Sequence, residues 1–281
     1  MAVIICLCMN KIFTINLLQR VLVAIVGIPL LLWIIQLGSM PFAGMVTLLA
    51  LLATLEFHHI ARQKAEPPPV WFAVLGTLLL QTNYFYPVML FRELLLLLLL
   101  SLLVIQLFVK GSSPLLDIGS FLPGFLYVNL SFGALMELRL RSTAPQGESM
   151  VFLLFFCVWA ADVFAYFGGS FLGGRFIRRK LFERMSPNKT WEGFLAGFAG
   201  SIAVSLLFAS LATNLSLQTA LQTGVLIGLA SPVGDLVESM FKRDAGIKNS
   251  SALIPGHGGV LDRFDTIMFV SPFIYFITRY F

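Results

Sequence analysis

The fold of this chain is decided by stretches such as Leu94–Val109, which has the sequence LLLLLLLSLLVIQLFV. An α-helix needs about 20 apolar residues to cross the hydrocarbon core of a bilayer, with a range of about 17–25. Only helices suit such stretches here, because lipid offers no partner to unpaired backbone groups and no alternating barrel pattern is present. The predicted spans are Val21–Leu37, Phe42–Phe57, Val70–Tyr84, Leu94–Val109, Gly119–Met136, Val151–Gly168, Phe194–Ala212, Thr219–Val237 and Thr266–Tyr280. We therefore expect an all-α, polytopic membrane helix bundle of about nine transmembrane helices.

The composition of the whole chain supports this fold class. Of the 281 residues, 58% are hydrophobic and 12% are charged, and the mean hydropathy is +0.89. A soluble domain is about 45–50% apolar and about 25% charged, and a core of this size cannot hide the excess. A soluble enzyme, a disordered tail and a fibrous repeat are therefore excluded. The three cysteines, Cys6, Cys8 and Cys157, support neither a disulfide framework nor a zinc site.

The basic residues predict how the chain is oriented. With the N-terminus inside and the spans alternating, the 19 Lys and Arg residues divide 15 inside to 4 outside. The two most basic segments, Gly173–Gly193 and Glu238–Asp265, then lie on the same cytoplasmic side. We attribute the net charge of +5 to this topology signal and expect no nucleic-acid partner.

Chemical information is concentrated in the second half of the chain. Residues 1–150 are leucine-rich and carry few polar groups, whereas from Val151 onward polar residues occur in tight groups inside or beside the spans. We therefore divide the chain into N-terminal transmembrane helices, 1–150, and a C-terminal catalytic transmembrane region with cytoplasmic loops, 151–281. No internal repeat supports an inverted-repeat transporter.

The first polar group lies at the end of the eighth predicted span. Asp235, Glu238, Ser239 and Lys242 occur at i, i+3, i+4 and i+7, so they share one face of a helix. An ionisable residue within a membrane span is costly and is most often functional. A helix-end carboxylate that is simply paired with a nearby lysine is an equally good explanation of Asp235 taken alone.

The second group favours a functional site more clearly. Pro255–Asp265 has the sequence PGHGGVLDRFD, in which three glycines surround His257 and two carboxylates follow, Asp262 and Asp265. Glycine allows close approach of the backbone to a ligand, and the start of a helix favours anions. Acidic residues in a first helical turn would explain the two carboxylates by themselves. They would not explain the glycines, the histidine and Arg263 together.

Cations lie between these two groups. Lys242, Arg243 and Lys248 fall within seven residues and would ordinarily anchor a cytoplasmic loop. Here they stand beside carboxylates that suit Mg²⁺, and lysine and arginine neutralise phosphate charge. The combination is typical of a site for a nucleoside triphosphate and its metal ion. A P-loop is excluded, because the chain has no Walker-type motif.

Two upstream groups leave alternatives open. Asp162 shares a helical face with Trp159 and Tyr166, either to lock helices together or to form a wall of the site. Ser186–Gly193 (SPNKTWEG) predicts a turn before a span, capped by Asn188 or Thr190. Lys189 in this turn is equally a phosphate ligand or an interface anchor.

Together these groups resemble the phosphatidate cytidylyltransferase (CDP-diacylglycerol synthase) family. The segments that match its motifs are Trp159–Tyr166, Ser186–Gly193, Gly234–Arg243 and Pro255–Asp265. The resemblance covers roughly residues 151–265, and so many fixed polar positions make it specific. One position departs from the family pattern: Asn249 stands where an aspartate is usual. An asparagine keeps an oxygen acceptor but loses the charge, so the change alters activity if that charge is needed and is harmless if it only orients Lys248.

The resemblance implies that CTP and phosphatidate react to give CDP-diacylglycerol and pyrophosphate in phospholipid biosynthesis. It implies that Mg²⁺ is held by Asp235, Asp262 and Asp265, and that Lys242, Lys248 and His257 belong to the catalytic group. The residues expected to bind CTP or the lipid phosphate are Lys189, Arg243, Arg263, Gly258, Gly259, Asn188 and Asp162. A homodimer is also implied, and the compact length suggests a bacterial plasma membrane with the site on the cytoplasmic side.

Two other functions remain open at this stage. A CTP-dependent kinase of a membrane alcohol would use similar chemistry but would need a base to activate the hydroxyl, and it would release CDP. A transporter or proton channel would use intramembrane carboxylates as relay groups. It predicts polar residues along a path across the bilayer, whereas here they gather on one side.

Overall fold

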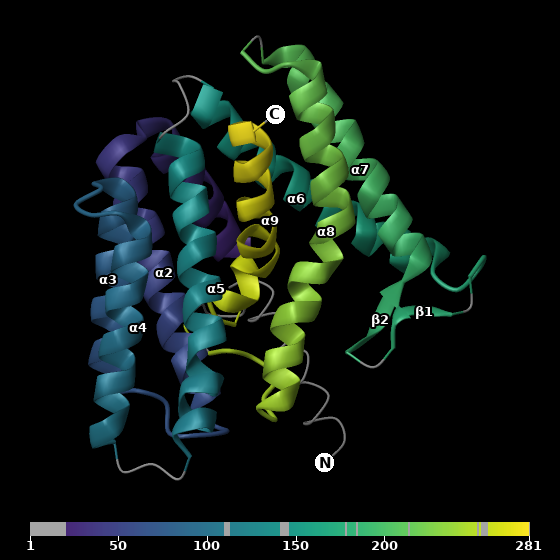
Figure 1. Cartoon of the computed structure of the whole chain (residues 1–281). Helices are drawn as coiled ribbons and strands as arrows, with labels where there is room; N and C mark the ends of the chain where they lie inside the picture. Colours follow the sequence, from purple (N-terminus) through teal and green to yellow (C-terminus); the bar gives the residue numbers. More distant parts are fainter. Residues whose placement is uncertain are drawn as a thin grey trace.

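The chain folds as a bundle of helices with one small hairpin at its side (Figure 1). The computed structural model describes residues 21–109, 113–140, 146–177, 179–183, 185–212, 214–251, 253 and 258–280. A first helix, Val21–Leu37, precedes α2 (Ser39–Ala61), α3 (Val70–Phe85), α4 (Phe91–Phe108), α5 (Pro114–Leu140), α6 (Gln146–Leu172), β1 (Lys180–Phe182), β2 (Ser186–Thr190), α7 (Trp191–Leu211), α8 (Leu217–Asp244) and α9 (Leu261–Tyr280). The predicted catalytic residue His257 lies outside the described residues.

The helices confirm the predicted all-α membrane class. Six of the described helices are long and apolar enough to cross a membrane: α2, α4, α5, α6, α7 and α8. The helix Val21–Leu37 and α3 are apolar but shorter, and α9 is not among the six. The chain is therefore an integral membrane protein, and the count of nine spans stays a prediction.

The helices continue beyond the apolar spans at the positions that carry polar residues. The eighth span was predicted to end at Val237, but α8 runs on to Asp244. The ninth was predicted to begin at Thr266, but α9 begins at Leu261. A helix satisfies its own backbone hydrogen bonds whether or not its surroundings are apolar, so hydropathy places the hydrocarbon core and not the helix ends.

The two predicted segments share one hydrophobic core. In the helices before residue 141, the ring of Phe57 meets Phe241 of α8 edge to face at 5.1 Å, and the ring of Phe132 lies 6.0 Å from Phe264 of α9. Buried residues from Ile35 to Ile274 belong to the same cluster. The boundary at residue 150 is therefore not a break in packing.

Helix α4, which carries the leucine run, lies at the edge of the bundle. It buries only Leu94, Leu98, Leu102 and Gln106, which recur every four residues along one stripe. Leu95 is partly buried, and the other leucines of the run are exposed, where lipid accepts them at no cost. A uniform leucine sequence therefore predicts a span, but it does not show which of its side chains pack against the bundle.

The hairpin differs from the sequence prediction. Residues 186–190 were predicted as a turn before a span, but they form β2, which pairs antiparallel with β1. The cap prediction was right for Thr190, whose Oγ1 accepts a hydrogen bond of 3.1 Å from the Gly193 amide at the start of α7. The hairpin joins α6 to α7 and brings its second strand against the bundle (Figure 1).

Candidate active site

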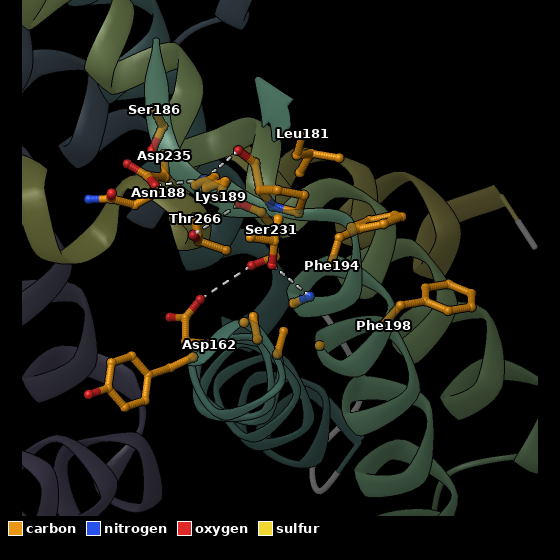
Figure 2. Close-up of a pocket in the computed structure, with 18 of the residues that line it drawn as sticks. Asp162, Leu181, Ser186, Asn188, Lys189, Phe194, Phe198, Ser231, Asp235 and Thr266 are labelled. Atoms are coloured by element: carbon orange, nitrogen blue, oxygen red, sulfur yellow. Dashed lines mark hydrogen bonds and ion pairs between the residues drawn. The ribbon is translucent and has the colours of Figure 1, made fainter. Parts of the chain in front are cut away.

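A pocket of about 640 Å³ opens between α6, α7, α8, α9 and the hairpin (Figure 2). Its lining is polar toward the hairpin and the start of α9 and apolar between α6 and α7. The polar lining includes Asp162, Ser170, Ser186, Asn188, Lys189, Thr190, Ser231, Asp235, Asp262, Arg263, Asp265 and Thr266. The apolar part includes Ala161, Ala165, Phe194, Gly197, Phe198 and Gly228. One cavity thus offers charged groups and an apolar wall together.

Three carboxylates converge beside this pocket, and two of them, Asp235 and Asp265, line it. Asp235 and Glu238 lie one turn apart on α8, Asp265 faces them from α9, and one oxygen of each lies within 4.8 Å of the others. Glu238 is 5% exposed, and its Oε1 has no hydrogen-bond partner among the described residues. We call these three residues the acidic cluster. Hard oxygen ligands and a buried carboxylate oxygen without a donor fit a divalent cation such as Mg²⁺.

Close packing of α8 against α9 brings the acidic cluster together. A Cβ atom at Gly234 would lie 2.8 Å from the Cα of Thr266 and 2.9 Å from the backbone oxygen of Asp265. Any larger residue at Gly234 would push α9 away and separate Asp265 from Asp235. The glycine that precedes Asp235 therefore has a steric role in the site.

Lys189 reaches the acidic cluster from the hairpin. Its Nζ forms an ion pair of 2.6 Å with Asp235 Oδ2 and donates a hydrogen bond of 3.0 Å to the backbone oxygen of Pro232 (Figure 2). Lys189 therefore lines the pocket, and its role as a phosphate ligand or an interface anchor stays a prediction. Asn188 lies beside it in the pocket lining.

Asp262 lies outside the acidic cluster and is bonded to a lysine and to backbone amides. Its Oδ1 pairs with Lys242 Nζ at 2.5 Å, and the same ammonium donates to Glu238 Oε2 at 2.7 Å. Its Oδ2 accepts hydrogen bonds from the amides of Gly259 and Ser250, at 2.8 and 3.1 Å. The predicted metal set was Asp235, Asp262 and Asp265. In the structure Glu238 completes the acidic cluster, and Asp262 reaches it through Lys242.

The two glycines before α9 are occupied by protein contacts. Gly258 has φ +88°, and a Cβ there would lie 2.6 Å from Asp262 Oδ2. A Cβ at Gly259 would overlap Ser250 Oγ and Glu56 Oε2. Both glycines were predicted to let backbone amides approach a phosphate. The Gly259 amide instead donates to Asp262, and both glycines make room for carboxylates of the protein.

The remaining predicted residues are spread around the pocket. Asp162 forms part of the wall from α6, where its Oδ1 accepts a hydrogen bond of 3.4 Å from Ser231 Oγ (Figure 2). Arg263 lines the pocket, whereas Arg243 and Lys248 are exposed and do not belong to the described lining. Asp162 thus lines the pocket and also links α6 to α8, so both of its interpretations stay open.

Two carboxylates were not predicted as site residues. Glu238 had a signal in the sequence, since it shares a helical face with Asp235. Glu56 had none, because it stands alone in the apolar helix α2, yet its oxygens meet the start of α9.

Almost the whole chain is similar to known proteins of one family. Residues 18–281 match the model of a family described as the cytidylyltransferase family. The phosphatidate cytidylyltransferase of Synechocystis sp. is 34% identical over 285 residues, which cover 92% of this chain and 95% of that protein. The proteins of the same name from Bacillus subtilis and Brucella abortus are 29% and 34% identical, over 94% and 92% of this chain and 98% and 92% of their own lengths.

Proposed function

The chain belongs to the cytidylyltransferase family, and from this membership we propose that it is a phosphatidate cytidylyltransferase, which converts CTP and phosphatidate to CDP-diacylglycerol and pyrophosphate. One observation carries the proposal. Asp235 and Asp265 of the acidic cluster and Lys189 line a pocket whose other wall is apolar and lies between membrane-spanning helices. A phosphate-rich nucleotide and a phospholipid need these two surfaces in one place.

The reaction joins two phosphates. A phosphate oxygen of phosphatidate attacks the α-phosphorus of CTP, a new phosphorus–oxygen bond forms, and the bond from the α-phosphorus to the bridging oxygen breaks. Pyrophosphate leaves with that bonding pair. A phosphomonoester is already a nucleophile, so the site needs no strong general base. It needs residues that align two anions and offset their charge.

Each group in the pocket has a part in that task. Lys189 and Arg263 neutralise phosphate charge, and Asn188 offers an amide beside them. Lys242 holds Glu238 and Asp262 at a fixed separation through its two ion pairs. Mg²⁺ bound by the acidic cluster would neutralise phosphate oxygens and stabilise the leaving pyrophosphate. Asp162 bounds the pocket on the side of α6.

The exposed cations Arg243 and Lys248 attract CTP before it binds. Arg243 and Lys248 lie outside the described pocket lining, close in the chain to its acidic residues. Cations near the mouth of a site raise the local concentration of an anionic substrate and its rate of association. We assign these two residues to the attraction of CTP.

The site lies on the cytoplasmic side of a bacterial inner membrane. The pocket forms where α6 and α8 approach their C-terminal ends and α7 and α9 begin, so its parts lie at one end of the bundle (Figure 1). Among the described residues, most Lys and Arg side chains belong to segments at that end, which supports a cytoplasmic face under the positive-inside rule. CTP then enters from the cytoplasm and phosphatidate from the bilayer. A homodimer remains part of the proposal.

The test identifies the phosphate product. Purified protein in detergent is incubated with CTP, Mg²⁺ and phosphatidate, and the released species are separated. Pyrophosphate in equal amount to CDP-diacylglycerol supports the proposal. Release of CDP with a phosphorylated lipid alcohol would identify a CTP-dependent kinase instead, and transport of a solute into proteoliposomes without turnover of CTP would identify a transporter.

A further inference from the structure

The carboxylate of Glu56 accepts four hydrogen bonds from residues near the C-terminal end of the chain. Glu56 lies near the end of α2 and is 6% exposed. Its Oε1 accepts hydrogen bonds from the Val260 amide at 2.9 Å and from Ser251 Oγ at 2.7 Å. Its Oε2 accepts from the Leu261 amide at 2.9 Å and from Ser250 Oγ at 2.8 Å. A carboxylate has about four acceptor positions, and all four are occupied here.

The four donors come from two segments that meet beside the pocket. Ser250 and Ser251 follow α8, and Val260 and Leu261 open α9. The first amides of a helix have no acceptor within the helix, and a carboxylate at that end also interacts favourably with the helix dipole. Glu56 therefore caps α9 from another helix and ties the loop after α8 to the same point.

The same two segments hold Asp262. Its Oδ2 accepts hydrogen bonds from the amides of Gly259 and Ser250, each next in the chain to a residue that Glu56 binds. Ser250 Oγ lies 2.8 Å from Glu56 and 3.0 Å from Asp262 Oδ2, and its single proton serves one of them at a time. A shift of Glu56 would therefore move the donors of Asp262.

The glycine at 259 is independent support for this arrangement. A Cβ atom there would overlap both Glu56 Oε2 and Ser250 Oγ. The carboxylate thus occupies the space that a side chain at residue 259 would fill.

We propose that Glu56 is a positioning residue of the active site, through which helix α2 fixes the start of α9 and the orientation of Asp262. The proposal rests on the proposed function, since it assigns Glu56 to the site of that reaction. Glu56 does not line the pocket. It acts through Ser250 and the backbone at the start of α9.

The central test is Glu56→Gln. Glutamine keeps the size of the side chain but replaces one acceptor oxygen by an NH₂ group, which would face a hydroxyl and an amide donor. We expect kcat for CTP and phosphatidate to fall about 10- to 100-fold, as for lost outer contacts of metal ligands, with little change in KM. Ser251→Ala, which removes one of the four donors, should lower kcat in the same direction by less.

Asp117→Asn is the matched control. Asp117 is also a buried carboxylate of the N-terminal helices, and it accepts hydrogen bonds from the Glu66 amide at 2.9 Å and from Gln106 Nε2 at 3.0 Å. Gln106 Oε1 has no partner among the described residues, so its amide can turn to accept from the new asparagine. We expect kcat of this variant to stay within about twofold of the parent. An equal loss of kcat in both variants would contradict a specific role for Glu56.

A second readout does not depend on activity. Lys248 is exposed in the loop after α8, and Lys180 is exposed in β1. In limited trypsin digestion in detergent, Glu56→Gln should raise the rate of cleavage after Lys248 about tenfold or more, because the loop opens more often. Cleavage after Lys180 should not change.

The two readouts separate the two proposals. A parent protein that is inactive with CTP and phosphatidate, but whose cleavage after Lys248 depends on Glu56, would refute the proposed function and leave the loop anchor standing. An active Glu56→Gln variant with parental kcat and parental cleavage after Lys248 would overturn the role of Glu56. If Glu56→Gln does not yield folded protein, Ser251→Ala supplies both readouts.

Discussion

The helices before residue 141 and those after residue 145 both bury polar side chains, but they use them in opposite ways. In the first region Thr54, Thr77, Gln81 and Asn129 are at most 1% exposed and bond to one another between α2, α3 and α5. We call these four residues the Asn129 network. In the second region Asp235 and Asp265 of the acidic cluster line a pocket, and Glu238 Oε1 has no donor among the described residues.

The difference shows how to distinguish structural from functional polar residues in a membrane protein. In lipid a buried polar group is costly unless it is paired. Each member of the Asn129 network bonds to another member and so helps to hold three helices together, although Gln81 Oε1 has no partner among the described residues. The acidic cluster instead gathers three carboxylates, two of which line a pocket, and this marks a binding site. Glu56 belongs by position to the first region and by its contacts to the second.

The largest effect should follow from Asp235→Asn. The change removes a charged oxygen ligand from the acidic cluster and the partner of Lys189. We expect the rate of pyrophosphate release at saturating Mg²⁺ to fall about 10³-fold, equivalent to roughly 4 kcal/mol of transition-state stabilisation. The elution profile in size-exclusion chromatography should not change. Parental turnover in this variant would contradict a functional role for the acidic cluster.

The next largest effect is expected for Lys189→Ala. The variant loses a cation that would meet a substrate phosphate, and charge-assisted hydrogen bonds contribute about 1.5–3 kcal/mol. We expect kcat/KM for CTP to fall about 10- to 100-fold. Lys180→Ala in the same hairpin, which lies outside the described pocket lining, is the control and should keep parental kcat/KM. Equal effects of both variants would indicate general attraction of CTP rather than a contact in the site.

A smaller loss should follow from Gly259→Ala. The added methyl group would overlap Glu56 Oε2 and Ser250 Oγ, so either these side chains or the turn must shift. We expect kcat to fall about tenfold, since misplaced site residues reduce rates steeply. Gly119→Ala in α5, where a Cβ would meet nothing within 4 Å, should leave kcat unchanged. If Gly259→Ala also keeps parental kcat, the turn is not as closely packed as the structure has it.

The Asn129 network should respond in stability and not in rate. Asn129→Ala removes bonds to Thr54 and Gln81, and hydrogen bonds between membrane helices contribute about 0.6 kcal/mol on average and up to about 1.7. We expect the free energy of unfolding in mixed micelles to fall by about 1–2 kcal/mol, with parental kcat for the folded fraction. Ser101→Ala is the control, because Ser101 Oγ bonds only within its own helix. A specific loss of kcat in Asn129→Ala would contradict a purely structural role.

The smallest effect is expected at the surface contact between the two regions. Lys64 and Asp244 form an ion pair of 3.4 Å, with side chains 47% and 72% exposed. Exposed pairs contribute about 0–1 kcal/mol. Lys64→Ala should therefore change the free energy of unfolding by less than about 0.5 kcal/mol and leave kcat unchanged. A larger effect would mean that this surface pair joins the two regions in addition to their shared core and Glu56.

Much of the candidate site could be predicted from the sequence. Asp235 and Asp265 were predicted to meet and do, because each lies near the end of a predicted apolar span and the two span ends lie side by side. The helical spacing from Asp235 to Glu238 and Lys242 also placed three charged groups on one face. What the spacing could not assign were partners, since Lys242 divides its bonds between a residue four positions away and one on the next helix.

Other features had no local signal. The strand at residues 186–190 follows from pairing with β1, and strand pairing is not readable from five polar residues. Nothing in the sequence around Glu56, which is followed by Phe57, His58 and His59, indicates a partner near residue 260. Its function depends on contacts more than 190 positions apart in the chain.

The sequence by itself determined that this chain enters a membrane as helices, which family it resembles and which end of the bundle carries the charged groups. Hydrophobicity and charge act on each segment separately, so they can be read segment by segment. Only the tertiary structure decided which carboxylates share the pocket, which are tied up by Lys242, and that a helix of the N-terminal half holds the start of α9. Those choices depend on distances of a few ångströms between distant segments, and close packing of helices sets such distances.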